Sequence, residues 1–502
     1  METSPDPGSG PAPAPGDAAP DGHGDQDGGA AARRGPDPGS RARRRRTLLV
    51  GLGAVAAVAA TALVAGLLSW RPDPPEPARA LTVAEAERLA AVRVTNYRDG
   101  RARLRATVGR DGDRVETVGW VDWTRSVIYL DVGGPGAGPL RGLVQATPDL
   151  VAVRPDPAAV LTPAVPPMVP PADNWRIRDL PDQPAVAALL DLLFALSADR
   201  PDPVARFDAA RWVARDTVDR TPVDVFRTTG TTPGPPGFPV DGTPVRPPSA
   251  DGWRYWVDRD ARLHRLTARL PDAVPVTLDL DRSHRPPLHP VAALGGAPGL
   301  PRDLTRAEAE RLVRMPGRNR ALGGTALVLA VPTGTGANLR GGGWLDWRGQ
   351  VAYLATTDLD APRQRTLARH DRSGVTRTKI PAGDEAPDAR PPLPPPREPR
   401  WERVRTGSGE LDLLVGAALR AALEAPDPHR ATWLRRDSAD KRPVDVVEVP
   451  GEGAPLRYWL DRTGVLRRLE LRTGAGAWAQ IDLVQAPVPR LPAVPVPRPS
   501  AR

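Results

Sequence analysis

The sequence contains no cysteine among its 502 residues. This excludes disulfides, thiolate metal sites, cysteine nucleophiles and a lipidated N-terminal cysteine. Lysine is almost absent as well, because Lys379 and Lys441 are the only two, although the net charge is +9. The arginines that carry this charge are interleaved with aspartate and glutamate, so no basic stripe emerges. We therefore do not expect a nucleic-acid partner.

Catalytic and metal-binding signatures are also missing. We find no GxSxG elbow, no P-loop and no GxGxxG in a strand–helix context. The six histidines are scattered, and the neighbours His284 and His289 lie in a proline-rich stretch. We therefore predict that the protein is not an enzyme, uses no cofactor and has no metal site.

One long apolar run is present, at residues 47–69, and it contains no charged residue. A helix of this length covers the roughly 30 Å hydrocarbon core of a bilayer. Arg41 and four further arginines precede the run, whereas the charges just after it balance. The positive-inside rule then predicts a single-pass cell-membrane protein with a cytoplasmic N-terminus and an extracytoplasmic C-terminal region. Cleavage at Ala80, within a small-x-small motif, is the alternative reading of this segment.

The remaining chain reads as two copies of one unit. Six segments recur in the same order, mostly 221–225 residues apart. Clear examples are LTVAEAERLA from Leu81 with LTRAEAERLV from Leu304, and RYWVDRDARLHRL from Arg254 with RYWLDRTGVLRRL from Arg457. The offset falls by about 20 at the last match, because a Pro/Gly-rich insertion at 230–250 lengthens the first copy. An internal duplication follows from this order.

The sequence pattern of each copy predicts a helix, then strands, then a second helix and further strands. The first helices begin with capping boxes, Thr82 with Glu85 and Thr305 with Glu308. Polar-apolar alternation then indicates strands. The predicted fold class is α+β: two tandem repeats, each a curved antiparallel sheet covered by helices, preceded by a single transmembrane helix. The predicted domains are a disordered cytoplasmic tail with a basic flank (1–46), the transmembrane anchor (47–69), repeat 1 (81–285), a linker (286–303), repeat 2 (304–487) and a disordered tail (488–502).

The pattern resembles the extracytoplasmic lipid-carrier fold of LolA-type proteins and the actinobacterial LppX/LprG-type lipoproteins, here in tandem. The segment LLFALSADRPDP, the short strands after it and the late YWVDRDARLHRL and YWLDRTGVLRRL hairpins carry the resemblance. It implies a curved sheet closed by helices around a cavity for acyl chains. This sequence departs from the lipoprotein members in lacking the lipidated cysteine.

The repeated W-x-D-W motif is the candidate binding site. Strand alternation places Trp120 and Asp122 on one face and Trp123 on the other. In one interpretation the tryptophans line an apolar cavity, and in the other they fill the core between sheet and helix. The candidate ligand-binding residues are Trp120, Trp123, Trp256, Trp344, Trp347 and Trp459.

The sequence favours a membrane-anchored extracytoplasmic protein that binds a hydrophobic ligand, expected to be lipid, in apolar cavities without catalysis. The alternative is a cell-envelope signalling or scaffold protein whose repeats bind another protein. The expected partners are thus the membrane and either lipid or a cell-envelope protein. The oligomeric state, the ligand and any protein partner stay open.

Overall fold

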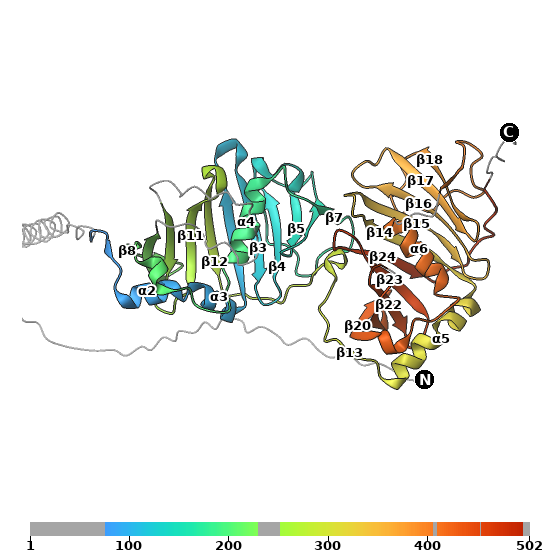
Figure 1. Cartoon of the computed structure of the whole chain (residues 1–502). Helices are drawn as coiled ribbons and strands as arrows, with labels where there is room; N and C mark the ends of the chain where they lie inside the picture. Colours follow the sequence, from blue (N-terminus) through green and yellow to red (C-terminus); the bar gives the residue numbers. More distant parts are fainter. Residues whose placement is uncertain (1–75, 229–251, 405–408, 452, 495–502) are drawn as a thin grey trace, which may run out of the picture. The chain divides into compact units, whose positions relative to one another are not determined.

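The computed structural model describes residues 76–228, 252–404, 409–451 and 453–494 (Figure 1). The predicted tail 1–46 and the apolar segment 47–69 lie outside these residues. Within the described residues, the strands form two sheets of 12 strands each. The strand pairings in both sheets are antiparallel, as expected for strands that follow one another through short turns.

The two sheets have the same strand order. The first runs β1 (Arg79–Ala80), β8 (Arg211–Val218), β9 (Thr221–Thr228), β10 (Trp253–Val257), β11 (Leu263–Arg269), β12 (Pro275–Asp281), β2 (Arg101–Val108), β3 (Val115–Asp122), β4 (Val127–Gly133), β5 (Gly142–Ala146), β6 (Val151–Pro155) and β7 (Arg176–Arg178). The second runs β13 (Arg302–Asp303), β20 (Thr432–Ala439), β21 (Arg442–Val449), β22 (Leu456–Asp461), β23 (Leu466–Arg472), β24 (Trp478–Val484), β14 (Gly324–Pro332), β15 (Asn338–Asp346), β16 (Val351–Asp358), β17 (Gln364–Asp371), β18 (Gly374–Pro381) and β19 (Glu402–Val404).

Short helices pack against one face of each sheet. The first sheet carries α2 (Val83–Ala90), α3 (Val92–Asp99) and α4 (Pro184–Ala195), and the second carries α5 (Arg306–Leu322) and α6 (Glu410–Arg420). The capping boxes predicted at Thr82 and Thr305 are confirmed, because each threonine and its glutamate partner exchange both hydrogen bonds. Each helix start is therefore encoded locally, by two side chains three residues apart.

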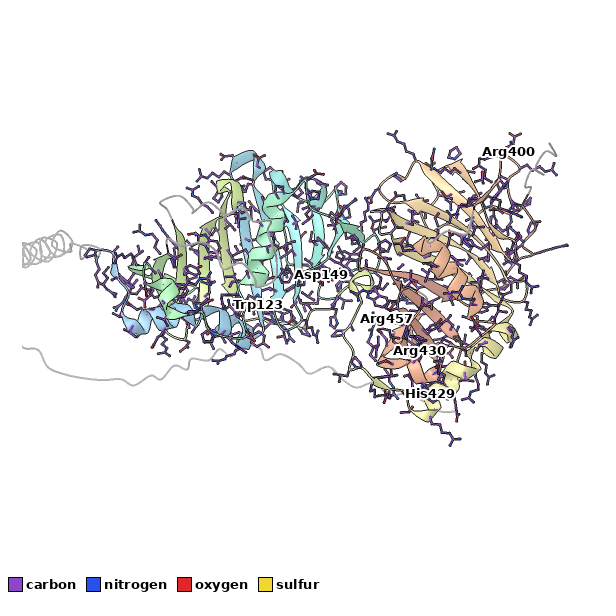
Figure 2. The ribbon with its side chains drawn as sticks, viewed as in Figure 1. Trp123, Asp149, Arg400, His429, Arg430 and Arg457 are labelled. Carbon is purple, nitrogen blue, oxygen red and sulfur yellow. The ribbon has the colours of Figure 1, made fainter. Side chains whose placement is uncertain are left out.

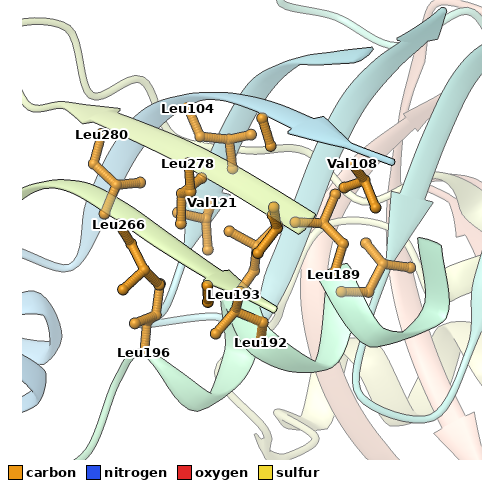
Figure 3. Packing of buried hydrophobic residues seen from close by; sticks show 14 of the residues in the cluster. Leu104, Val108, Val121, Leu189, Leu192, Leu193, Leu196, Leu266, Leu278 and Leu280 are labelled. Atoms are coloured by element: carbon orange, nitrogen blue, oxygen red, sulfur yellow. The ribbon is translucent and has the colours of Figure 1, made fainter. Parts of the chain in front are cut away.

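The core of the first sheet lies beneath α4. Leu189 and Leu193 of this helix are fully buried against strand residues such as Leu104 and Leu278 (Figure 3). Spacing of three to four residues places such leucines on one helix face, which explains why the helix lies flat on the sheet. The space between α4 and the sheet is thus filled by side chains, and α6 packs over the second sheet in the same way.

A return segment covers the opposite face of the first sheet. After β12 the chain crosses strands β4 and β5, where Arg125 donates to the Leu288 carbonyl at 2.8 Å and Gln145 donates to the His289 carbonyl at 3.0 Å. In the second sheet Arg369 bonds the Leu491 and Pro492 carbonyls in the same manner. These segments fall within the predicted linker and C-terminal tail. Both faces of the central strands are consequently buried.

The predicted α+β fold class is wrong. The described chain is mostly β and only about 20% helical. The helices are few, and the sheets are extended by strands that the sequence did not predict individually, such as β6, β7 and β18. Two long sheets with a single short helix layer replace the expected helix-covered repeats.

The predicted membrane topology and location are also corrected. Across the described residues no helix is both long and apolar enough to cross a membrane. The most apolar of them, α4, has 12 residues and spans only about 18 Å. Arg79 and Ala80, where cleavage was the alternative, form strand β1 and pair with Trp212 and Arg211.

Candidate functional site

Trp123 and Trp347 are core residues that fasten a helix to each sheet. Trp123, labelled in Figure 2, is 5% exposed, and its indole N–H donates to the Leu193 carbonyl of α4 at 2.8 Å. Trp347 is 1% exposed and donates to the Ala418 carbonyl of α6 at 3.0 Å. These matched bonds satisfy both buried donors. They also establish Leu193 and Ala418 as equivalent positions in the two repeats.

Trp120 and Trp344 lie on the opposite faces of their sheets, as strand alternation predicts for Trp120 relative to Trp123. Trp120 packs with Tyr129, at 6.3 Å between ring centroids, and with Leu288 of the return segment. Trp344 belongs to a cluster against which Leu491 packs. Each indole is therefore covered by its own return segment.

Trp256 and Trp459 occupy equivalent strand positions but differ in environment. Trp256 is half-buried, and its indole N–H donates to the Asp216 carboxylate at 2.9 Å. Trp459 is buried beneath the guanidinium groups of Arg468 and Arg435, which lie 4.6 and 5.3 Å from its ring centroid. The structure therefore does not bring the six predicted tryptophans together, since they occupy both faces of two sheets.

Trp123 nevertheless borders a recess of about 300 Å³ at the C-terminal end of α4. Its wall includes Tyr97 from α3, Phe194 from α4 and Pro148 from the turn between β5 and β6. Tyr97 is 48% exposed and stands at the mouth. Asp191 contributes a carboxyl whose pKa is raised by burial. The surface of the recess is mainly apolar, but Arg93, Asp199 and two serines, Ser126 and Ser197, also line it.

Buried polar contacts hold the helices that form this wall. Arg93 Nε donates to the Ala195 carbonyl at 2.7 Å, and its guanidinium pairs with Asp202 at 3.0 Å. Asn96, fully buried on α3, donates its amide to the Leu196 carbonyl at 2.8 Å. These bonds satisfy the carbonyls left free at the end of α4. They tie α3 to the C-terminal end of α4.

The second repeat fills the corresponding space. Ser126, which lines the recess, corresponds to Gln350, and the two share nearly the same backbone, with φ of 51° and 53°. The Gln350 amide donates to the carbonyls of Trp347 and Leu419 at 2.8 and 3.4 Å, and its side chain is buried. Phe194 corresponds to Leu419. A longer polar side chain thus occupies, in the second repeat, the place that is open in the first.

The sequence indicated Trp123 but not the other aromatic residues of the recess. Tyr97 is largely exposed and Phe194 is half-buried at the margin of the core, so the spacing of the fully buried leucines does not single them out. One signal in the sequence could have indicated them. Each is an aromatic residue on a helix, and the second repeat has a residue of another type at the equivalent position. This signal requires comparison of the repeats residue by residue.

Histidine and acidic side chains are the groups that could hold a metal ion in the described residues. No group of three His, Cys, Asp or Glu side chains among them is placed to hold a metal ion. His264 bonds Asp258 at 3.0 Å. His370 is buried, and burial lowers its pKa to about 4. His370 is therefore neutral near pH 7 and is enclosed by the protein.

Comparison with known proteins gives weak matches. No family model and no curated protein matches the chain. A domain from Vibrio parahaemolyticus assigned to outer membrane lipoprotein sorting is similar at 13% identity, over 35% of this chain and 91% of that one, with a TM-score of 0.17. An AttH-type protein from Nitrosomonas europaea is similar at 9% identity, over 77% and 92%, with a TM-score of 0.10.

Proposed function

We propose that the protein is a non-catalytic binding protein that holds a short acyl chain or similar apolar group in the recess beside Trp123. The supporting observation is the recess itself, with three aromatic side chains around about 300 Å³. Ligand pockets are typically about 300–1,000 Å³, mostly apolar, with a few polar groups. The volume of the recess fits one short acyl chain. The space between α4 and the sheet is already filled by protein side chains.

The expected affinity follows from the area involved. A chain that buries about 200 Å² of apolar surface gains roughly 5 kcal/mol. Immobilising the ligand subtracts from this gain. Even the gross figure corresponds to a dissociation constant of only about 0.2 mM. A weak, readily reversible association is therefore expected, as suits a carrier or sensor better than a storage protein.

The second repeat supplies a matched pair of variants. Ser126→Gln introduces the residue that fills the equivalent space at Gln350, on a backbone that already accommodates it. Octanoate binding to the full chain is measured by ligand-observed NMR. The S126Q variant is expected to bind at least tenfold more weakly, whereas Q350S retains wild-type affinity. Undetectable octanoate binding to the wild type, or equal binding by S126Q, would overturn the proposal.

A second candidate function is protein binding, favoured by one exposed loop. Between β6 and β7 the chain displays apolar side chains in a proline-rich segment, with Val160 and Val169 both 76% exposed and Met168 41% exposed. Backbone bonds hold this loop, since Gly134 and Ala164 donate to the Leu161 carbonyl and the Asp131 carboxylate. A fixed, uncovered apolar patch of this kind is typical of an interaction surface.

A photoreactive residue at Val169 tests this second function in cells that express the full chain. A discrete adduct with one protein is expected, together with its loss when Val160 and Met168 are changed to serine. The same photoreactive residue at Val204, which is 40% exposed on another element, serves as the control. Identical adducts from both positions would exclude a specific surface.

A further inference from the structure

An arginine-lined cleft of about 880 Å³ opens at one end of the first sheet. The turn between β8 and β9, the turn between β10 and β11, and the chain leaving β12 form its walls. Seven arginines and five aspartates line it. No residue lines both this cleft and the recess beside Trp123. The cleft is therefore a separate candidate site.

Three guanidinium groups share one carboxylate at the base. Arg282, whose side chain is only 8% exposed, donates to Asp99 at 3.0 Å and to the Asn96 side-chain oxygen at 2.5 Å. Arg262 and Arg285 lie 3.4 and 3.5 Å from the same Asp99 carboxylate. Arg262 also pairs with Asp260 at 3.3 Å, so two carboxylates face three guanidinium groups and one positive charge is left over at this point.

The rim adds arginines with weak or no pairing. Arg215 and Arg259 are 82% and 91% exposed, and their nearest carboxylates lie at 3.8 and 3.9 Å. Arg220 has no carboxylate within ion-pair distance among the described residues, and it stands in the β8–β9 turn with φ of 68°. These guanidinium groups are available to an incoming anion.

The second repeat shows that the fold does not require this charge cluster. Its equivalents of Arg262, Arg282 and Arg285 are Val465, Gln485 and Val488, and Asp99 corresponds to Leu322. Val465 and Arg262 occupy the same place in the hairpin turn. The Val465 carbonyl accepts a hydrogen bond from the Asp461 amide, and the Arg262 carbonyl accepts one from the Asp258 amide.

One ion pair of the cleft wall, by contrast, occurs in both copies. Arg88 bonds Asp224 at 2.8 Å, and Arg311 bonds Asp445 at 2.6 Å. The base cluster is therefore present in the first repeat alone.

We propose that this cleft binds a small ligand that carries two or more phosphate groups. Guanidinium forks match phosphate oxygens in pairs, and several arginines on separate elements suit a ligand with more than one anionic centre. A ligand with a single carboxylate group would pair with only one of these arginines. The volume accommodates a ligand larger than inorganic pyrophosphate, which is therefore the minimal probe.

Rim variants test the site without disturbing the packed base. The full chain is titrated with pyrophosphate by calorimetry at low salt, where charged contacts are least screened. The double variant Arg220→Gln with Arg259→Gln is expected to bind at least tenfold more weakly. Its control changes Lys441 and Arg462, the equivalent residues of the second repeat, to glutamine, which removes the same net charge.

The control variant is expected to bind within twofold of the wild type. Equal losses in the two double variants would assign the binding to overall charge and overturn the proposal. Absence of pyrophosphate binding by the wild type, or equal binding of citrate, would overturn it too. S126Q is expected to leave pyrophosphate binding unchanged, so failure of this site and failure of the recess beside Trp123 are distinguishable.

Discussion

Replacement of Leu193 by alanine tests whether the interior beneath α4 is packed or hollow. Leu193 is fully buried in the cluster shown in Figure 3, and its equivalent in the second repeat, Ala418, is also fully buried. Alanine is therefore compatible with the backbone here, and the loss comes from the cavity. Leucine-to-alanine changes at such sites cost about 2–5 kcal/mol. We expect about 3 kcal/mol for L193A.

Hydrogen exchange of the full chain measures this loss in the first sheet alone. A loss of about 3 kcal/mol accelerates exchange of the most protected amides of β2, β11 and β12 by roughly a hundredfold. Leu300→Ala, at a position 83% exposed, is the control and is expected to change stability by no more than about 0.5 kcal/mol. An L193A effect below about 1 kcal/mol would refute a packed interior and indicate an open apolar cavity under α4.

Three further predictions concern single groups. Gly119→Ala is expected to destabilise the first sheet by about 3 kcal/mol, because the added Cβ would overlap the Tyr129 carbonyl oxygen, whereas Gly112→Ala, with open space around it, is neutral in thermal unfolding. Hydrogen bonds from Arg79 and Arg302 lower the pKa of Glu85 and of Glu308 to about 2. The stability that the two ionised glutamates contribute is complete above pH about 4.5 and is lost as pH falls towards 2. In the E85Q/E308Q variant the unfolding free energy is therefore expected to depend less on pH between about 4.5 and 2. Burial lowers the pKa of His370 from 6.5 to about 4, so the unfolded chain binds this proton first and stability falls as pH drops from 6.5 to 4. In the H370F variant this decrease of the unfolding free energy with falling pH, measured by urea titrations at a series of pH values, is expected to disappear. An unchanged pH dependence would exclude His370 as its source.

Features fixed by neighbouring residues could be predicted from the sequence. The capping box of Thr82 and Glu85 depends on two side chains three residues apart, and it is present as expected. The hairpin turn at Asp461 is likewise local, since its carboxylate accepts from the Thr463 and Val465 amides and Gly464 takes a φ of 83°. Alternation also placed Trp120 and Trp123 on opposite faces. Each of these follows from spacing alone.

Features that depend on distant segments could not be predicted in this way. Trp120 was a candidate for a cavity wall, but Leu288, far away in the chain, covers it. The residues around Leu288 are rich in proline and show no periodicity, so they read as a linker. The fold class failed for a related reason, since short strands such as β7 are defined by their pairing partners and not by their own pattern. Tertiary contacts decide these assignments.

The differences between the repeats locate function more sharply than their similarities. Contacts that hold the fold occur in both, as when Asn96 and Asn319 each donate at 2.8 Å to a carbonyl at the end of the following helix, Leu196 and Ala421. At the two proposed sites, by contrast, Ser126, Phe194 and the three arginines at the base of the cleft are replaced by other residue types in the second repeat, although Trp123 and the rim arginines Arg220 and Arg259 have counterparts there. Buried packing alone would keep both copies alike, and unconstrained drift would scatter the changes over the surface. Concentrated differences at an aromatic recess and at the base of an arginine cleft therefore support the proposal that both sites belong to the first repeat.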